Sequence, residues 1–243
     1  MLRLLAVFII ALLIGLIATL PLKLVLGLTT NGVDLSRAEI HGSIWNGTIR
    51  GARLGQVSMR RAQIHTRPWT LPGGRPAIDW VLADAGLRGS GLARVDLHGN
   101  WQVLDAQLVG VPVRMGLQEI PGLTEAAVIT VSLDRLDFTG GHCAAASGVM
   151  TAAFSADLSQ EFGLAVPELN GALECRGGEL VAALSGETAD MTVAADMIFG
   201  SAAVAWTIDI ATTNADLGNA LSYSGFQLSD GIWRQNGEMG HAD

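Results

Sequence analysis

Two cysteines are the residues of this sequence with the clearest capacity for chemistry. Cys143 and Cys175 each precede a glycine-containing turn and an apolar run, which indicates analogous places on two hairpin-like units. A disulfide between them would close a loop of about 33 residues and stabilise the fold by roughly 3–4 kcal/mol in the chain-entropy model. Such a bond requires an oxidising compartment. Two buried free thiols are the alternative that the sequence leaves open.

The sequence lacks the short motifs that mark common catalytic sites. It contains no G-x-S-x-G, P-loop, G-x-G-x-x-G, H-E-x-x-H or C-x-x-C pattern. His142 stands beside Cys143, but with Cys175 it still falls short of the four ligands of a zinc shell. Asp134 and Asp137 are three residues apart and face opposite sides of a strand unless a bulge intervenes, which does not suit an acid–base pair. We therefore predict no enzyme activity, no metal and no cofactor.

The elements that carry these residues are predicted to be β-strands. Large apolar residues alternate with small or polar ones over Val204–Ile210, as in a strand with one buried face. Over Ile129–Phe138 the alternation changes phase near Asp134 and Arg135, which indicates a β-bulge. The best helix candidate after the N-terminal segment is Thr213–Ser222, with Thr213 or Asn214 as its N-cap.

Turn signals separate the predicted strands. Asn-Gly and Asp-Gly pairs favour the type I′ turn of a β-hairpin. Because strands then follow each other without crossover helices, we expect one curved, mostly antiparallel sheet rather than two domains. The predicted turns are Asn31-Gly32, Asn46-Gly47, Gly73-Gly74, Gly99-Asn100, Gly140-Gly141, Gly177-Gly178 and Asp230-Gly231.

An apolar run without charges occupies Leu4–Leu22, between Arg3 and Lys23. As a helix it would be about 28 Å long, close to the thickness of the hydrocarbon core of a bilayer. Ala18-Thr19-Leu20 is a poor match to a signal-peptide cleavage site. We therefore expect a short cytoplasmic end over residues 1–3, an uncleaved transmembrane helix over 4–22 and a periplasmic β-rich domain over 30–243.

Charge is distributed unevenly along the chain. Twelve of the 15 lysines and arginines precede residue 126, whereas 15 of the 23 acidic residues follow it. The net charge of −8 argues against nucleic acid as a partner. A basic stretch without any acidic residue lies between His41 and Ile78, and it faces either solvent or anionic lipid headgroups. Its arginines are Arg50, Arg53, Arg60, Arg61, Arg67 and Arg75.

About 20 residues after the apolar run, the chain reads Gly42-Ser43-Ile44-Trp45-Asn46-Gly47. This G-x-x-W-x-G pattern, the two cysteine regions at 136–148 and 173–180, and the closing segment 221–237 resemble, in this order, the type II secretion system protein N family. The resemblance implies a structural role for Gly42, Trp45 and Gly47. One departure is the stretch Thr66–Pro76, where proline and glycine interrupt the cleaner strand that the family leads us to expect.

The resemblance also implies a function. It implies a non-enzymatic accessory component of the type II secretion system, anchored in the inner membrane of a Gram-negative bacterium, that helps to assemble or stabilise the export machinery through contacts with other components. Exposed strand edges would allow docking by strand addition. The alternative is a periplasmic β-groove protein that binds lipid or another hydrophobe. An open apolar face around Val204, Trp206, Ile208 and Ile210 would favour lipid, and a covered one would favour docking.

Overall fold

The structure is a computed structural model that describes residues 33–34, 38–54, 57–96, 98–115, 117, 127–154, 165–200 and 203–240. The predicted cytoplasmic end, the predicted membrane helix over Leu4–Leu22 and the predicted turn at Asn31-Gly32 lie outside these residues. Within the described ranges, no helix has the length and apolar character needed to span a membrane.

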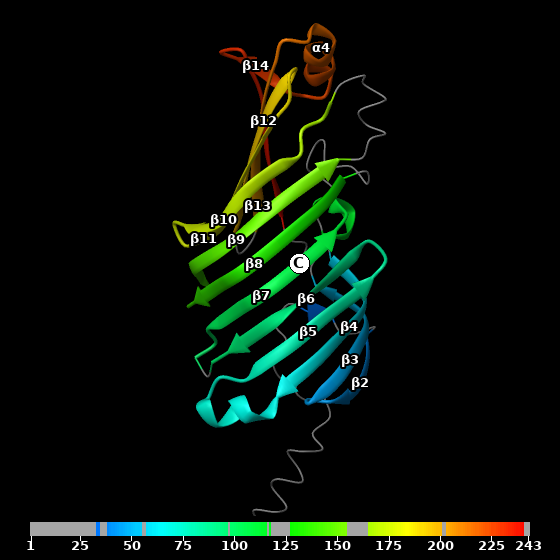
Figure 1. The fold of residues 1–243 in the computed structure, drawn as a ribbon, viewed down its shortest axis with the longest axis vertical. Coiled ribbons are helices and arrows are strands. Elements are labelled where there is room, and N and C mark those ends of the chain that lie inside the picture. The colour runs from blue at the N-terminus through cyan, green and yellow to red at the C-terminus, as the bar shows by residue number, and fades with distance from the viewer. Residues whose placement is uncertain are drawn as a thin grey trace, which may run out of the picture.

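The described residues form one large antiparallel sheet of 15 strands (Figure 1). From β3 to β13 each strand pairs with the next one in the chain; β1 and β2 both pair with β3 at one edge, and β15 and β14 follow β13 at the other. The prediction of a mainly β, antiparallel fold is therefore confirmed. The strands are β1 (Val33–Asp34), β2 (Glu39–Ser43), β3 (Asn46–Leu54), β4 (Val57–Arg67), β5 (Ala77–Asp84), β6 (Leu87–Val95), β7 (Trp101–Gly110), β8 (Ala127–Thr139), β9 (His142–Phe154), β10 (Leu169–Arg176), β11 (Glu179–Glu187), β12 (Met191–Phe199), β13 (Ala203–Thr212), β14 (Gln227–Ser229) and β15 (Ile232–Gly240).

Helical elements are few among the described residues. The 3-10 helix η1 (Pro68–Gly73) joins β4 to β5 in the stretch that the sequence marked as irregular, and η2 (Pro112–Arg114) follows β7. The helix α4 (Ala215–Tyr223) matches the predicted helix. Its N-cap is Asn214, whose side-chain oxygen accepts hydrogen bonds from two backbone N–H groups of the first turn.

Three of the predicted turns are two-residue hairpins with positive φ at both positions, as a type I′ turn requires. They are Gly140-Gly141, Gly177-Gly178 and Asp230-Gly231. The prediction of a turn at Asn46-Gly47 is wrong, because these residues already belong to β3 and the turn residues are Ile44 and Trp45. The strand β4 holds this turn in place through Thr66, so contacts with a third strand outweigh the local preference of Asn-Gly.

The predicted β-bulge is confirmed in β8. The register between β8 and β9 shifts between Leu133 and Arg135, so that Asp134 is the extra residue. The shift changes which side chains share a face: Leu133 pairs with Gly148 and Leu136 with Ala146, so the buried Leu136 lies on the same side as Leu133. The phase change seen in the sequence thus keeps one apolar face continuous along a strand of 13 residues.

The strand register gathers apolar side chains on one face, which we call the inner face. Ile129 pairs with Ala152 and Ala152 pairs with Leu169, and all three are at most 5% exposed. One buried cluster extends over the inner face from β8 to β15 and includes Leu221 of α4. Since each such residue removes apolar surface from water, this cluster is the main stabilising core of the described chain.

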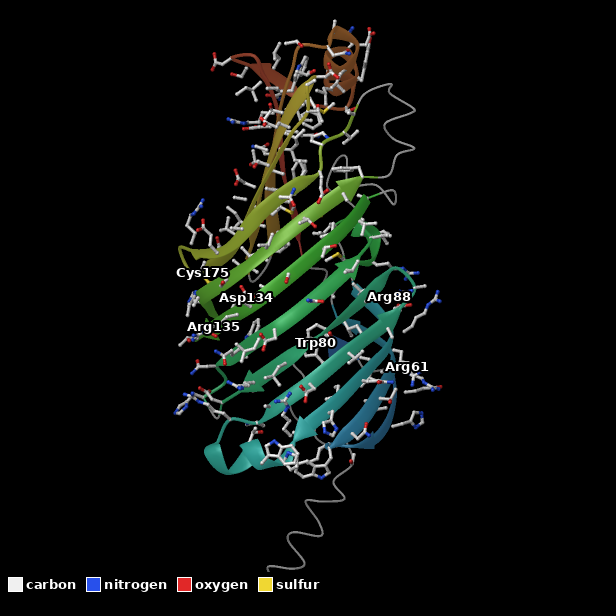
Figure 2. All side chains as sticks on the ribbon, in the orientation of Figure 1. Arg61, Trp80, Arg88, Asp134, Arg135 and Cys175 are labelled. Atoms are coloured by element: carbon white, nitrogen blue, oxygen red, sulfur yellow. A yellow bond between two sulfur atoms is a disulfide. The ribbon has the colours of Figure 1, made fainter. Side chains whose placement is uncertain are left out.

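The inner face of β2 to β7 is packed more lightly. Its buried cluster consists of Ile49 and Ala62 with half-buried neighbours. Trp80, near the middle of the N-terminal half of the sheet (Figure 2), lies across two glycines: a Cβ atom on Gly91 would be 2.9 Å, and one on Gly89 3.3 Å, from its ring. The indole therefore lies flat on the backbone, and the apolar surface around it stays partly accessible.

Candidate functional site

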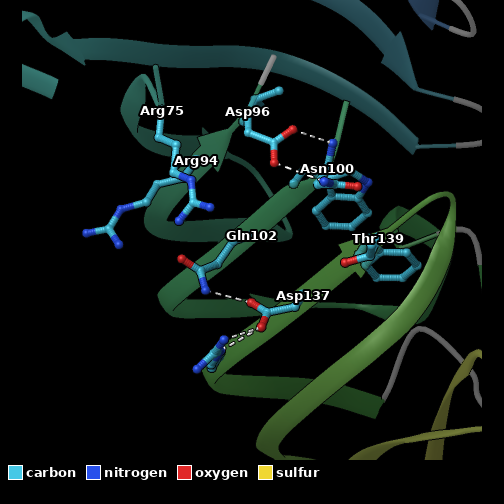
Figure 3. A pocket seen from close by; sticks show the side chains of 11 residues that line it. Arg75, Arg94, Asp96, Asn100, Gln102, Asp137 and Thr139 are labelled. Carbon is cyan, nitrogen blue, oxygen red and sulfur yellow. Dashed lines mark hydrogen bonds and ion pairs between the residues drawn. The ribbon is translucent and has the colours of Figure 1, made fainter. Parts of the chain in front are cut away.

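Asp134 and Asp137, the two carboxylates that the sequence places three residues apart, bind different partners. Asp134 accepts a hydrogen bond from the Ser147 hydroxyl at 3.3 Å. Asp137 is bound by Arg135 at 2.7 Å and by the Gln102 side-chain amide at 2.7 Å (Figure 3). The hydrogen bond from Arg135 holds the pKa of the Asp137 carboxyl below its ordinary value. A carboxylate that stays ionised and paired is a structural group on the sheet surface rather than a proton donor at neutral pH.

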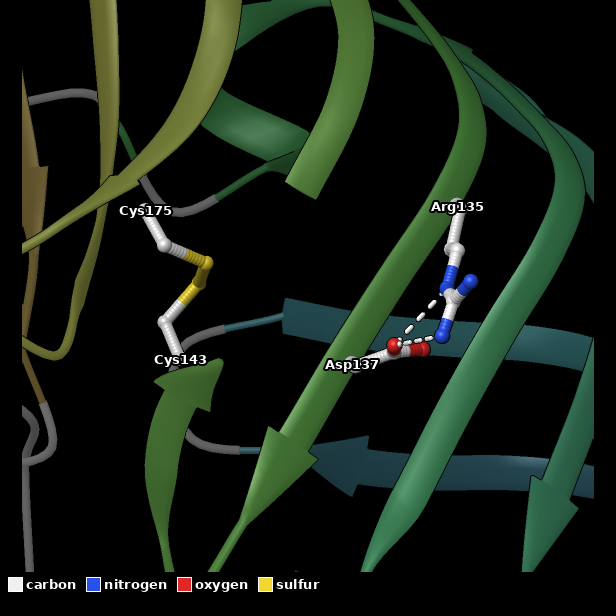
Figure 4. The surroundings of a disulfide bond; sticks show 4 residues. All are labelled: Arg135, Asp137, Cys143 and Cys175. Carbon is white, nitrogen blue, oxygen red and sulfur yellow. Dashed lines mark hydrogen bonds and ion pairs between the residues drawn. A yellow bond between two sulfur atoms is a disulfide. The ribbon is translucent and has the colours of Figure 1, made fainter. Parts of the chain in front are cut away.

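Cys143 and Cys175 form a disulfide, with their Cα atoms 5.5 Å apart (Figure 4). The bond joins the start of β9 to the end of β10. Backbone pairing between these strands stops at Gly148 and Leu173, so the disulfide closes the end of the strand pair that the ladder leaves open. Of the two alternatives for the cysteines, a disulfide or two buried free thiols, the structure has the disulfide. His142 is therefore not part of a site with free thiols, and within the described residues no three His, Cys, Asp or Glu side chains are grouped as metal ligands.

The Gly42–Gly47 motif builds the hairpin between β2 and β3. Gly42 pairs with Gly47, has a φ of +94°, and would place a Cβ atom 2.3 Å from the carbonyl oxygen of Asn46. The backbone N–H of Thr66 donates to the carbonyl oxygen of Trp45 at 3.2 Å, and its hydroxyl donates to that of Ile44 at 2.6 Å. A side chain at position 42 would clash with the backbone, which explains the glycine there. The hydrogen bonds from Thr66 hold the hairpin against β4.

The C-terminal edge of the sheet is formed by β14 and by part of β15. The strand β14 pairs with Ile232–Arg234 of β15, and within the described residues no strand pairs with the outer side of β15 beyond Arg234. Leu228 on β14 is 58% exposed and Ile232 is 37% exposed. An open edge with accessible apolar side chains is the part of a sheet to which another extended segment can add.

The four residues whose exposure was expected to separate lipid binding from docking are largely buried. Val204, Trp206 and Ile208 are each at most 8% exposed, and Ile210 is half-buried against the same cluster. Leu221 of α4 and Phe226 belong to that cluster, so the helix and the chain after it close this part of the face. The C-terminal half of the inner face is thus a packed core.

Comparison with known proteins gives one family. The family model described as type II secretion system (T2SS), protein N, matches residues 34–235, which is most of the chain. The chain belongs to this family. No curated protein matches the chain, and no solved structure does.

Membership of the protein N family makes the chain an accessory component of the type II secretion system, and it implies contacts with other components of that system. The matched residues take in the Gly42–Gly47 hairpin, both cysteines and the start of β15. The features that sequence reasoning missed are contacts between distant segments. Trp101 and Phe138, for example, stack with ring centroids 4.1 Å apart, although nothing in their spacing signals a pair.

Proposed function

We propose that this protein N family member is anchored in the inner membrane by its N-terminal apolar run and docks, through the C-terminal edge of its periplasmic sheet, on another component of the secretion machinery. Docking would stabilise the assembled machine without any chemical step. The observation that carries the proposal is the open edge at β14, with Leu228 exposed on it.

Hairpin geometry specifies how a partner would attach to β14. In a two-residue hairpin the pair next to the turn, here Ser229 and Ile232, is hydrogen-bonded, and the following pair, Leu228 and Trp233, is not. The N–H and C=O groups of Leu228 therefore point away from β15 toward the open side. An added strand would pair with these two groups.

The charge around this edge favours a basic partner segment. From Glu179 to Gly240 the chain carries eight acidic residues and one basic residue, Arg234. Complementary charge increases the rate of encounter and suppresses wrong partners. The proposed partner segment is therefore extended, carries lysine or arginine, and presents apolar side chains toward Leu228.

Site-specific photo-crosslinking tests the docking surface. A photoreactive phenylalanine in place of Leu228, introduced into the full chain in its native membrane, should form an adduct with another secretion component, identified by mass spectrometry. The matched control is the same probe at Val149, which is 50% exposed in the middle of the sheet on the opposite, outer face. Equal adducts at both positions, or none containing a secretion component, would contradict edge docking.

Two substitutions separate backbone pairing from side-chain contact. Leu228→Pro removes the outward N–H group but leaves the ladder to β15 intact, whereas Leu228→Ala keeps the N–H group and removes the apolar side chain. With a probe placed at Ile232, we expect the proline variant to lose the adduct and the alanine variant to keep part of it. Loss in the alanine variant alone would indicate docking without strand addition.

A second candidate function, binding of a lipid or another hydrophobe, is favoured by the lightly packed inner face of β2 to β7. There Ile64, Ile78, Trp80 and Leu82 are half-buried, in contrast to the closed core around Trp206. An acyl chain could lie along this apolar strip.

Mass spectrometry of the detergent-purified full chain tests this candidate. Lipid should co-purify with the protein and be lost from Trp80→Glu, while Tyr223→Glu, which alters an aromatic ring that is 94% exposed at the end of α4, should retain it. Absence of any co-purifying lipid would exclude the candidate.

A further inference from the structure

A hollow of about 240 Å³ opens beside the ends of β6, β7 and β8, three neighbouring strands from the middle of the strand order (Figure 3). Arg94 is the penultimate residue of β6, Gln102 is the second residue of β7, and Asp137 is near the end of β8. Arg75, from the segment between η1 and β5, lines the hollow together with Asp96 and Asn100. This hollow is far along the sheet from the β14 edge and takes no part in the docking proposed above.

Both carboxylates in the hollow already have internal partners. Asp96 accepts hydrogen bonds from the backbone of His98 at 2.8 Å, and from the backbone and side chain of Asn100 at 3.0 and 2.9 Å. The Asn100 amide is the main reason that the pKa of Asp96 lies below its ordinary value. Asp137 is held by Arg135 and Gln102, as described above. Both acids are therefore already hydrogen-bonded within the chain, and Asp137 is also paired with a cation, Arg135.

Arg75 and Arg94 are the arginines of the hollow that have no ion-pair partner among the described residues. Both are exposed, and within the described residues neither has a side-chain hydrogen bond or an ion pair. Figure 3 shows the two side chains extending on the same side of the hollow. Two guanidinium groups that line one hollow repel each other, and an oxyanion between them would relieve the repulsion and accept their planar sets of N–H donors.

The surroundings indicate where such an oxyanion comes from. Trp101, stacked on Phe138, is 39% exposed beside the hollow, and the neighbouring Val95 is 38% exposed. Trp69, in the helix η1 that leads to Arg75, is 75% exposed. Accessible tryptophan next to arginine is the combination found where proteins meet the headgroup layer of a membrane.

The geometry points to a binding site for a phosphate group, held by Arg75 and Arg94 and presented by an anionic lipid headgroup. The exposed indoles of Trp69 and Trp101 lie in the same headgroup layer. The ligand class is a phosphate diester with a net negative charge, because a zwitterionic headgroup would bring its own cation toward the two arginines. The site orients the side of the sheet where these strand ends lie toward the membrane surface, which leaves the β14 edge free.

Calorimetric titration tests the site with the full chain in nanodiscs of phosphatidylcholine. The probes are glycerophosphoglycerol, which is the soluble headgroup of phosphatidylglycerol, and inorganic phosphate. The test variant is Arg75→Gln/Arg94→Gln. The control is Arg61→Gln/Arg88→Gln, which removes the same charge from two exposed arginines across the sheet from Arg135 (Figure 2).

We expect glycerophosphoglycerol to bind, and the affinity to fall about fivefold for each arginine removed from the hollow, or about 25-fold for the pair. The control variant should bind like the natural protein. Nanodiscs that contain phosphatidylglycerol should weaken the apparent binding of the soluble headgroup by competition. Equal losses in both variants, or no binding of either probe, would overturn the site. Binding without competition from phosphatidylglycerol would overturn the lipid as its source.

Discussion

Arginine–aspartate pairs are the main polar contacts on the outer face of the sheet. Arg234 on β15 binds Asp209 on β13 through two N–H groups at 2.6 and 2.5 Å, and Arg67 on β4 binds Asp79 on β5 at 2.8 and 2.7 Å. In each pair the arginine side chain is more than 40% exposed. Exposed pairs add little to stability, because solvent screens them. Their clearest effect is on the pKa of the aspartates.

Removal of the disulfide should lower stability by a large amount. In the double variant Cys143→Ala/Cys175→Ala the free energy of unfolding should fall by roughly 3–4 kcal/mol, because the unfolded chain regains the entropy of a loop of about 33 residues. Urea denaturation of the oxidised natural protein and the variant would measure the difference. The reduced natural protein serves as the control and should behave like the variant. A difference below about 1 kcal/mol would show that the bond restrains little beyond what the β9–β10 ladder already fixes.

The N-cap of α4 allows a second residue-scale prediction with a matched control. Asn214→Ala removes the side-chain oxygen that accepts two backbone hydrogen bonds, and it should cost about 1 kcal/mol in the free energy of unfolding. Asn219→Ala changes an exposed asparagine inside the same helix and should be neutral or slightly stabilising, since alanine is the better helix former. Thermal or urea denaturation distinguishes them; equal effects would refute a capping role for Asn214.

At the scale of elements, local chemistry predicted most of the sheet. Paired turn residues at Gly140-Gly141, Gly177-Gly178 and Asp230-Gly231 place the hairpins, since positive φ is available to few residues. The phase change near Asp134 located the bulge, because alternation is a direct record of strand geometry. The prediction of a turn at Asn46-Gly47 was wrong because the position of that hairpin depends on Thr66, more than 20 residues away in the chain.

The hollow and the difference between the two halves of the inner face were beyond sequence reasoning for a related reason. Arg75, Arg94, Asn100 and Asp137 come from separate segments with no common motif, and only the strand register brings them to one place. Alternation in Val204–Ile210 predicts a buried face, but it does not show that α4 closes that face. Burial by a distant element is a tertiary property that short-range patterns do not encode.

Packing between β13 and β15 gives a prediction at the scale of elements. A Cβ atom on Gly237 would lie 2.5 Å from a ring carbon of Trp206. Gly237→Ala should therefore displace the indole and lower the free energy of unfolding by about 1–3 kcal/mol. Gly73→Ala is the control, because its Cβ atom would meet nothing within 4 Å, and it should change stability by less than about 1 kcal/mol. Denaturation monitored by tryptophan fluorescence measures both; an unchanged Gly237→Ala protein would contradict the packing.

At the scale of the whole molecule, packing and charge divide the sheet in the same way. The C-terminal strands have a closed apolar core and an acidic surface, whereas the N-terminal strands have a half-exposed inner face and most of the arginines. A sheet built in this way can use separate places for different contacts. The acidic C-terminal strands carry the open edge proposed for docking, and the hollow proposed for phosphate lies at the ends of β6 to β8, where the two halves of the sheet meet.

The outer-face pairs predict how stability depends on pH. Hydrogen bonds from Arg67, Arg135 and Arg234 hold the pKa values of Asp79, Asp137 and Asp209 below the ordinary value of an aspartate. A depressed pKa in the folded state stabilises the protein above the pKa of the unfolded chain, about 3.9, and this contribution is lost as the pH falls through the folded value. We therefore expect a stable plateau near neutral pH and a modest decline from these pairs below about pH 4.

One substitution separates this effect from general acid unfolding. Arg234→Gln removes the guanidinium that depresses the pKa of Asp209, so the variant should be less stable than the natural protein at pH 7. The difference between the two proteins should shrink as the pH falls below about 4. Once Asp209 is protonated, Arg234 no longer stabilises it in the natural protein, so the loss of Arg234 in the variant matters less. Arg61→Gln, which changes an exposed arginine without an ion pair in the described part of the chain, should show no such convergence. Urea midpoints measured at a series of pH values test this, and a difference that stays constant for Arg234→Gln would show that the pair acts through packing and not through the charge of Asp209.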